Sequence, residues 1–298
     1  MESPVTTLPG LVKPVVLTGP VVQVTDAEMR RYAELIYQRT GIRVSPQKKT
    51  LLSNRLRRRL RETGIATFED YYKYLTTLRP SDPEWDAFLQ EITTHETYLF
   101  RDEAQWTWFR NQFLSQWAAQ ASERGAPALR IWSAACSTGD EPFTAACCIA
   151  ATLPDLSQWK IYILGTDIGT GALEQARAAV FNERSMRLVP KDYRSRFFTK
   201  ARNAQVWQAK PVLTAMVTFR HHNLLNPLRE PPFDLVFLKN VLIYFDAASK
   251  QRVVDNVRTT VRPGGFLVAG AAEGVGDLMR DFERLEPWLY RRPNAKRN

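Results

Sequence analysis

The spacing of apolar residues divides the chain into two parts. Between residues 23 and 90, apolar side chains recur at steps of three and four residues, as in Leu52, Leu56 and Leu60. This spacing predicts amphipathic helices. Thr25, followed three residues later by Glu28, predicts a capped helix start. We therefore expect a small all-helical domain over residues 23–90, preceded by a flexible, proline-containing tail over residues 1–22.

Beyond residue 90 the pattern changes to short apolar runs that end in small or polar residues. Four such runs lie at residues 131–142, 159–167, 233–245 and 262–270. A helical pattern over residues 172–180 follows the second run. Because strands and helices alternate in this way, we expect a parallel, Rossmann-like α/β sheet within residues 91–298.

The segment at residues 131–142, IWSAACSTGDEP, predicts a strand, a tight loop and the start of a helix, an arrangement that places a cofactor against the main chain. It contains one glycine, Gly139, where a dinucleotide-binding fingerprint has three. This favours S-adenosylmethionine, which carries no phosphate, over NAD. Asp167 ends the next predicted strand, where a carboxylate can accept hydrogen bonds from ribose hydroxyls. The alternative is that Asp167 caps the following helix.

Composition excludes several classes of protein. The 298 residues are 44% hydrophobic and 24% charged, which is ordinary for a globular protein. No apolar run approaches the roughly 18 residues that span a bilayer, and the start, MESPVTTLPG, does not resemble a signal peptide. We therefore expect a cytoplasmic protein without membrane insertion. The cysteines, Cys136, Cys147 and Cys148, have neither CxxC nor paired histidine spacing, so we expect no disulfide framework and no metal site.

The formal net charge is +10, and the densest cluster of charge lies in one predicted helix. Its members are Arg55, Arg57, Arg58, Arg59 and Arg61. With the leucines of this helix packed inward, we expect the arginines to spread over its exposed side and face an acidic protein. A solvated face is the alternative. Nucleic acid is not expected as a partner, because no nucleic-acid-binding motif accompanies the cluster.

Several runs together carry a family resemblance. They are TTHETYLFR at 93–101, WSAACSTGDEP at 132–142, ILGTD at 163–167, FRHHNLL at 219–225, and FDLVFLKNVLIYFD with RPGGFLVAGAAE near the end. The runs occur in the same order as in the chemotaxis receptor protein-glutamate O-methyltransferases (CheR). The chain resembles this family from about residue 25 to residue 290. The resemblance implies methyl transfer from S-adenosylmethionine to glutamate side chains in the cytoplasmic helical domain of chemoreceptors, with S-adenosylhomocysteine as the product.

The resemblance also implies which residues form the site. Cofactor contacts are implied for His95, Thr97, Arg101, Glu141, Asp167, Asn223, Leu224, Asn240 and Val241. Glu141 is suited to the cofactor's ammonium group, and Arg101 to its carboxylate or to the substrate's. Asn223 and Leu224 suit the edge and the face of adenine. We expect Arg101 and Tyr244 to hold the target carboxylate. As alternatives, Arg101 bridges the two domains and Tyr244 is a core aromatic residue.

This chemistry needs no general base, because a glutamate side chain is already ionised at neutral pH. Alignment of the two reactants, worth roughly 7 to 11 kcal/mol, can supply most of the catalysis. Two rival functions stay open: a methyltransferase of nucleic acid or of a small molecule, and a non-catalytic cofactor-sensing scaffold. The presence of Arg101, Glu141, Asp167 and Asn240 argues against the second.

The chain departs from the family pattern in four places. His95 replaces the usual Asn, Lys239 the common Arg, and Asp140 a Glu. The fourth place is residues 191–219, where we expect the small β-subdomain of the family. Members that bind a receptor tether there carry a glycine-containing loop, and this chain has no glycine between Ser185 and Arg220. We therefore expect no binding of a tether peptide.

Overall fold

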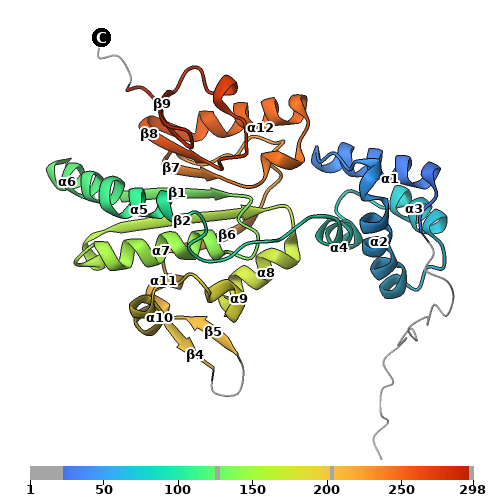
Figure 1. The fold of residues 1–298 in the computed structure, drawn as a ribbon, viewed down its shortest axis with the longest axis horizontal. Coiled ribbons are helices and arrows are strands. Elements are labelled where there is room, and N and C mark those ends of the chain that lie inside the picture. The colour runs from blue at the N-terminus through green and yellow to red at the C-terminus, as the bar shows by residue number, and fades with distance from the viewer. Residues whose placement is uncertain (1–22, 125–127, 202–204, 295–298) are drawn as a thin grey trace, which may run out of the picture.

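The computed structural model describes residues 23–124, 128–201 and 205–294, and Figure 1 shows a helical domain beside a larger α/β domain. The expected flexible tail, residues 1–22, lies outside the described residues. Within the described ranges, every helix is too short or too polar to cross a bilayer.

The N-terminal domain is built from helices. They are α1 (Asp26–Thr40), η1 (Pro46–Lys48), α2 (Lys49–Thr63), α3 (Phe68–Thr77) and α4 (Pro83–Ile92). The predicted capped start is confirmed: the Glu28 N–H donates to Thr25 Oγ1 at 3.2 Å, and the Thr25 N–H donates to Glu28 Oε2 at 2.7 Å. Leu52, Leu56 and Leu60 are buried as expected. They pack with the aromatic residues of α1, α3 and α4 into one core.

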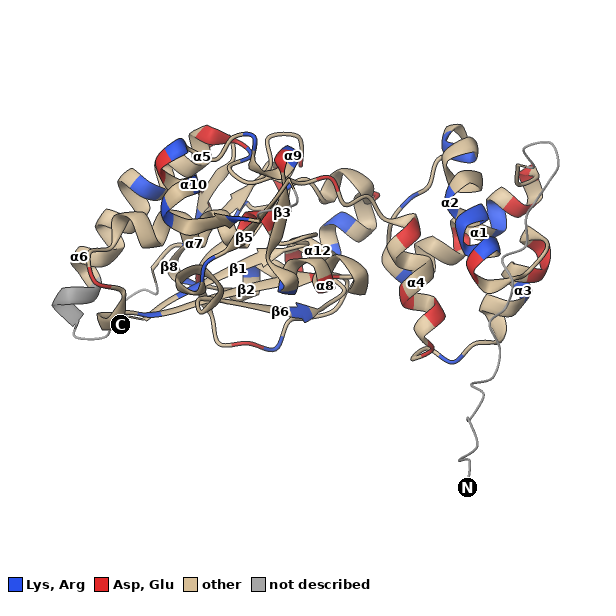
Figure 2. Cartoon of the chain, turned by 90° about the horizontal axis from the view of Figure 1, so that it is seen from below, with Lys and Arg blue, Asp and Glu red and all other residues tan. Residues whose placement is uncertain are grey.

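One arginine of the predicted surface cluster lies in this core instead. Arg59 is buried, and its Nη2 lies 2.7 Å from Glu84 Oε2 on α4, with a second ion pair to Glu62. The expectation that all five arginines spread over the exposed side is therefore wrong for Arg59. The cause is the packing of α2 against α4, which brings Glu84 to the inward face of α2. In Figure 2 the ribbon of α2 is marked mainly by basic residues and that of α4 by acidic ones.

The α/β domain is organised around a seven-stranded sheet. Its strands are β1 (Ala128–Ala134), β2 (Lys160–Asp167), β6 (Val217–His221), β7 (Phe233–Leu238), β8 (Val261–Ala269), β9 (Glu283–Glu286) and β10 (Leu289–Arg291). The order is β6-β2-β1-β7-β8-β10-β9: the first five strands are parallel, and β10 pairs antiparallel with both β8 and β9. The order reverses at β1, between β2 and β7, where open α/β sheets bind ligands. The predicted Rossmann-like sheet is confirmed.

Helices cover both faces of this sheet (Figure 1). They are α5 (Glu103–Trp108), the π-helical turn η2 (Phe109–Leu114), α6 (Ser115–Arg124), α7 (Asp140–Thr152), α8 (Thr170–Ala178) and α12 (Ala247–Thr260). Strand β7 is buried throughout, because Leu235 and Phe237 pack into the core under α7 while Val236 and Leu238 pack into the core under α12. A strand covered on both faces reads as a continuous apolar run, as it does here.

The expected small β-subdomain is present, with different limits. Its sheet has the order β3-β5-β4, from β3 (Val180–Asn182), β4 (Phe198–Lys200) and β5 (Val206–Ala209), with α9 (Glu183–Met186), α10 (Lys191–Phe197) and α11 (Pro211–Thr214) around it. The expected range 191–219 omits β3 and includes the start of β6, which pairs with β2 of the large sheet. Strand β3 is too short to show a pattern in the sequence.

The two domains meet along the end of α1. Ile42 forms an antiparallel bridge with Phe245, and the Arg43 N–H donates to the Tyr244 carbonyl at 3.0 Å. Gly41 permits the approach: its φ is +73°, and a Cβ there would lie 3.0 Å from Ser249 Oγ. The helical domain therefore holds the main chain that carries Tyr244.

Candidate functional site

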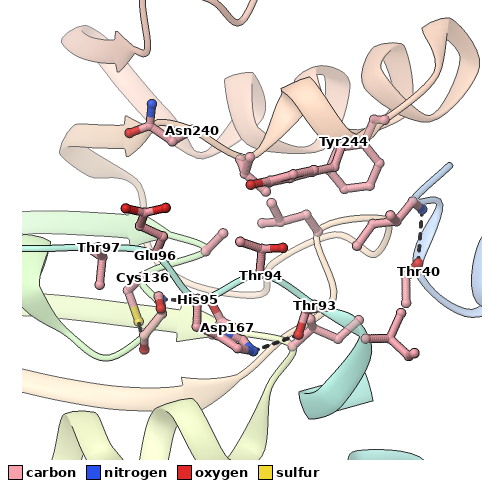
Figure 3. Close-up of a pocket in the computed structure, with 18 of the residues that line it drawn as sticks. Thr40, Thr93, Thr94, His95, Glu96, Thr97, Cys136, Asp167, Asn240 and Tyr244 are labelled. Carbon is pink, nitrogen blue, oxygen red and sulfur yellow. Dashed lines mark hydrogen bonds between the residues drawn. The ribbon is translucent and has the colours of Figure 1, made fainter. Parts of the chain in front are cut away.

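A pocket open to solvent lies between the domains at the carboxyl ends of β1, β2 and β7. Figure 3 shows residues from both domains and from the linker around it. All the residues predicted for the cofactor and the target carboxylate line it: His95, Thr97, Arg101, Glu141, Asp167, Asn223, Leu224, Asn240, Val241 and Tyr244. Strands far apart in the sequence thus deliver the predicted residues to one cavity.

The main chain around the cavity is strained. Ala135, Ser137 and Asn240 line it, and they have φ values of +61°, +51° and +57°. Phe100 and Asp102, on either side of Arg101, have φ values of +61° and +65°. Left-handed φ values are uncommon for residues other than glycine and cluster at functional sites.

Asp167 joins the ends of two neighbouring strands. Its Oδ2 accepts the Ser137 N–H at 2.8 Å, and its Oδ1 accepts the Gly169 N–H at 2.8 Å. The second bond closes the turn before α8, but the N-cap of α8 is Gly169 and the helix has no side-chain cap, so Asp167 does not cap it. Each carboxylate oxygen can accept a further hydrogen bond. The ribose contact stays a prediction that this geometry permits.

His95 lies beside Asp167, and its Nε2 is 2.7 Å from Thr93 Oγ1 (Figure 3). Burial lowers the pKa of His95, and the negative charge of Asp167 opposes this shift. The ring is therefore neutral at neutral pH. A neutral imidazole can serve, like the asparagine it replaces, as a hydrogen-bonding group without charge.

Glu141 is held through both of its carboxylate oxygens. The Ser133 hydroxyl donates to Oε1 at 2.7 Å, and the ammonium group of Lys239 lies 3.4 Å from Oε2. Lys239 also pairs with Asp102 at 3.1 Å. Sequence reasoning noted Lys239 only as a departure from the family pattern and did not place it in the site.

Arg101, in the linker between the domains, and Tyr244, in the segment after β7, both line the cavity. Arg101 Nη1 donates to the Glu96 carbonyl at 3.1 Å within the linker, and its guanidinium lies 5.6 Å from the centre of the Tyr98 ring. Tyr244 is half-buried, and the Lys48 ammonium group lies 5.9 Å from the centre of its ring. Neither residue therefore belongs to the closed core, and both are accessible to a bound acceptor.

Comparisons with known proteins identify the family. Residues 95–288 match the SAM binding domain of the CheR methyltransferases, and residues 27–93 match their all-alpha domain. The chain belongs to the CheR methyltransferase family. It is 33% identical over 263 residues to a chemotaxis protein methyltransferase of Escherichia coli, covering 87% of this chain and 88% of that one. It is 27% identical to a chemotaxis protein methyltransferase of Borreliella burgdorferi, covering 91% and 96%.

The pocket of this CheR protein fits S-adenosylmethionine, the cofactor of its family domain. Ser137 Oγ and His222 Nε2 are buried in the pocket wall and have no hydrogen-bond partner among the described residues. Such atoms are normally satisfied, so they indicate a polar ligand. Two carboxylates, on Glu141 and Asp167, suit an ammonium group and a ribose, and the buried Leu224 suits adenine.

Asn223 has a role that sequence reasoning missed. Its Nδ2 donates to the Arg39 carbonyl on α1 at 2.8 Å, and its Oδ1 accepts the Leu225 N–H at 3.0 Å. The amide therefore ties the helical domain to the end of β6. Its contact with the adenine edge stays a prediction. One N–H of the Asn223 amide is left to make that contact.

Glu273 was also missed. Its carboxylate is fully buried, Oε1 accepts the Val241 N–H at 3.0 Å, and burial raises its pKa. Glu273 thereby fixes the turn that carries Asn240 and Val241. The signal in the sequence was an acid at the end of the apolar run RPGGFLVAGAAE, which is costly unless the acid is hydrogen-bonded.

The remaining arginines of the predicted cluster differ in their surroundings. Arg55 lines the pocket and donates to the Ile92 carbonyl and, at 3.1 Å, to Thr94 Oγ1, so it braces the linker. Arg58 is exposed and pairs with Glu91 at 3.2 Å. Arg57 is half-buried and Arg61 is exposed, and for these two and Arg58 a contact with an acidic partner stays a prediction.

The cysteines add no further chemistry to the site. Cys136, Cys147 and Cys148 are free thiols, and burial raises the pKa of each. In the described part of the chain, no group of three or more His, Cys, Asp or Glu side chains is arranged to hold a metal ion.

Proposed function

We propose that this CheR protein transfers the methyl group of S-adenosylmethionine to glutamate side chains in the cytoplasmic helical domain of chemoreceptors. The product pair is a glutamate methyl ester and S-adenosylhomocysteine. The observation that carries the proposal is the pairing of Arg101 and Tyr244 with the cofactor-binding pocket of the family. Its relatives are named chemotaxis protein methyltransferases, which supports the choice of receptor as substrate.

The chain's residues have to bind and align, and they need not move a proton. Bound S-adenosylmethionine supplies a methyl group that is electrophilic because it is attached to a sulfonium. The acceptor carboxylate is ionised at neutral pH, so neither His95 nor His222 is required as a base. In the proposal, the Arg101 guanidinium and the Tyr244 hydroxyl bind the acceptor carboxylate by charge-assisted hydrogen bonds. Methylation removes the charge, so these bonds weaken and the ester is released.

The cofactor is assigned to the inner part of the pocket. Asp167, with His95 beside it, is proposed to bind the ribose hydroxyls, and Glu141 the ammonium group of the amino-acid end. Leu224 is proposed to lie against adenine. Thr97, Asn240 and Val241 complete the wall between these groups. Exclusion of water by this wall strengthens each charged contact inside the site.

The acceptor is assigned to the mouth of the pocket. Arg43 and Lys48 of the helical domain line the pocket, together with the exposed apolar side chain of Leu51. A receptor helix that carries glutamates next to apolar residues would complement both kinds of group. We also propose that the protein acts in the cytoplasm and does not need a receptor tether.

The net charge of +10 favours one rival, a methyltransferase of nucleic acid. The stability of the methylated product in alkali distinguishes a receptor methyltransferase from a nucleic-acid methyltransferase. Glutamate methyl esters release methanol in alkali, whereas methyl groups on nucleobases are retained.

The test incubates the protein with tritiated S-adenosylmethionine and membranes that contain host chemoreceptors. We expect alkali-labile label on a receptor-sized band, and loss of most of it in Arg101→Met. Arg252→Met, an exposed arginine of α12, is the matched control and should retain labelling. Absence of label from the receptor, or label that survives alkali, would overturn the proposal.

A further inference from the structure

Lys239, the residue after β7, is a lysine with a side chain only 3% exposed. Lysine is rarely buried to this degree unless its charge is paired. Its ammonium group lies 3.1 Å from Asp102 Oδ2, 3.4 Å from Glu141 Oε2 and 5.3 Å from the centre of the Trp106 ring. The charge is therefore compensated by two carboxylates and the face of an indole.

These contacts join three segments of the site. The ammonium group also donates to the Arg101 carbonyl at 3.5 Å. Its partners lie in the linker before α5 and in the first turn of α7, while Lys239 itself lies in the turn after β7. The three segments carry Arg101, Glu141 and Asn240. One buried charge thus sets the distances among three residues to which we assign substrate or cofactor contacts.

Glu141 is the partner that this arrangement restricts most. The Ser133 hydroxyl donates a hydrogen bond to one of its carboxylate oxygens and the Lys239 ammonium group forms an ion pair with the other, so the side chain cannot turn without losing one of these two contacts. A carboxylate fixed before binding loses no rotational freedom when the ligand arrives.

We propose that Lys239 is a positioning residue of this CheR protein. It holds the Glu141 carboxylate and the main chain at Arg101 in the arrangement that receives the amino-acid end of S-adenosylmethionine. The inference rests on the cofactor contacts in the proposed function. In this role Lys239 acts through Glu141 and the Arg101 main chain, and not on the reacting atoms.

Charge alone predicts that loss of Lys239 tightens cofactor binding, whereas positioning predicts that it weakens binding. The direction of the change in Kd therefore tests the proposal. Asp102 and Glu141 carry two negative charges, and Lys239 carries one positive charge. Removal of the lysine charge leaves more negative charge to attract the ammonium group of the cofactor. If charge were the main contribution of Lys239, its loss would tighten cofactor binding. If positioning is its main contribution, its loss weakens binding.

The experiment measures the Kd of S-adenosylmethionine and of S-adenosylhomocysteine by calorimetry, without receptor. We expect Lys239→Met to raise both Kd values by at least about tenfold. A Glu141 carboxylate that is no longer held in place should lose about one charge-assisted hydrogen bond to the cofactor. Lys210→Met is the control, because Lys210 also donates to main-chain carbonyls, at 2.9 and 3.0 Å, but lies in the β-subdomain. An unchanged or tighter Kd in folded Lys239→Met would overturn the proposal.

A second variant and a cycle separate positioning from a general loss of structure. Lys239→Gln keeps hydrogen-bond donors without the charge and decides the question if Lys239→Met does not fold. In the cycle with Glu141→Gln, we expect the second substitution to cost much less once Lys239 has been replaced, because both act through one carboxylate. Additive losses would contradict this. Because no acceptor is present, cofactor binding with no receptor methylation would end the proposed function and leave this inference intact.

Discussion

The carboxylate of Asp167 accepts a hydrogen bond from the main-chain N–H of Ser137 at 2.8 Å. The bond connects the end of β2 to the loop after β1, where Ser137 has a left-handed φ of +51°. Asp167 therefore holds this loop, and its remaining lone pairs are available for the ribose contact that we propose.

Replacement of Asp167 should weaken cofactor binding. Asp167→Ala loses charged hydrogen bonds worth about 1.5 to 3 kcal/mol each, so we expect the Kd of S-adenosylmethionine to rise by at least about tenfold in calorimetry. Asp155→Ala is the matched control, since Asp155 also accepts a main-chain N–H, from Ser157 at 3.0 Å, but is exposed and remote from the pocket. A wild-type Kd in Asp167→Ala would remove Asp167 from the ribose site.

Arg59 should contribute to stability rather than to receptor binding. Its ion pair with Glu84 joins α2 to α4, and the two side chains are 9% and 12% exposed. Removal of one partner of a buried pair leaves the other charge unpaired, so Arg59→Met should lower the free energy of unfolding by about 3 kcal/mol in urea titrations. Exposed Arg61→Met should change it by less than about 0.5 kcal/mol. Equal effects of the two substitutions would contradict the buried position of Arg59.

Stability should fall in mild acid because of His222. Burial, with the positive charge of Arg220 next, lowers the pKa of His222 to about 4. The unfolded chain takes up this proton near pH 6.5, so between about pH 6.5 and pH 4 only the unfolded state binds it and the free energy of unfolding decreases. Since the ring is only partly buried, we expect a loss of about 1 to 2 kcal/mol.

The variant His222→Gln should flatten this part of the pH dependence, measured by urea unfolding at several pH values. Some slope remains, because burial also lowers the pKa of His95. His221→Gln, at the exposed neighbouring position, is the control. A slope in His222→Gln as steep as in the wild type would show that His222 is not the group responsible.

The contact between the domains can be measured at Gly41. Gly41 and Gly64 end α1 and α2 with nearly the same left-handed φ, +73° and +74°. Substitution by alanine should cost about 1 kcal/mol at each for the backbone conformation. Only Gly41→Ala also forces a Cβ to within 3.1 Å of Leu225 in the other domain. We therefore expect Gly41→Ala to be the more destabilising in urea, and equal losses would argue against this contact.

The sheet could be predicted from sequence because its signals are local. A strand such as β7, buried on both faces, appears as an apolar run, and the polar residues of the turn after it, which include Asn240, must lie at the ligand-binding edge. The same rule placed Asp167. These inferences need no knowledge of which segments pack together, apart from the rule that parallel strands end at one edge.

What could not be predicted depends on contacts between distant segments. Lys239 and Glu273 acquire their roles from partners far away in the sequence, Asp102 and Val241. Arg59 was a different case, because it follows Leu52 by seven residues and therefore belongs to the inward face of α2. Its charge led to the wrong expectation, although the helical spacing indicated burial.

The most direct test of the account is a crystal structure of this protein with S-adenosylhomocysteine bound. We predict that the ribose hydroxyls contact the Asp167 carboxylate, that the amino-acid end lies at Glu141, and that the sulfur faces the side of the pocket where Arg101 and Tyr244 lie. Product bound outside this pocket, or inside it with the ribose away from Asp167, would contradict the account.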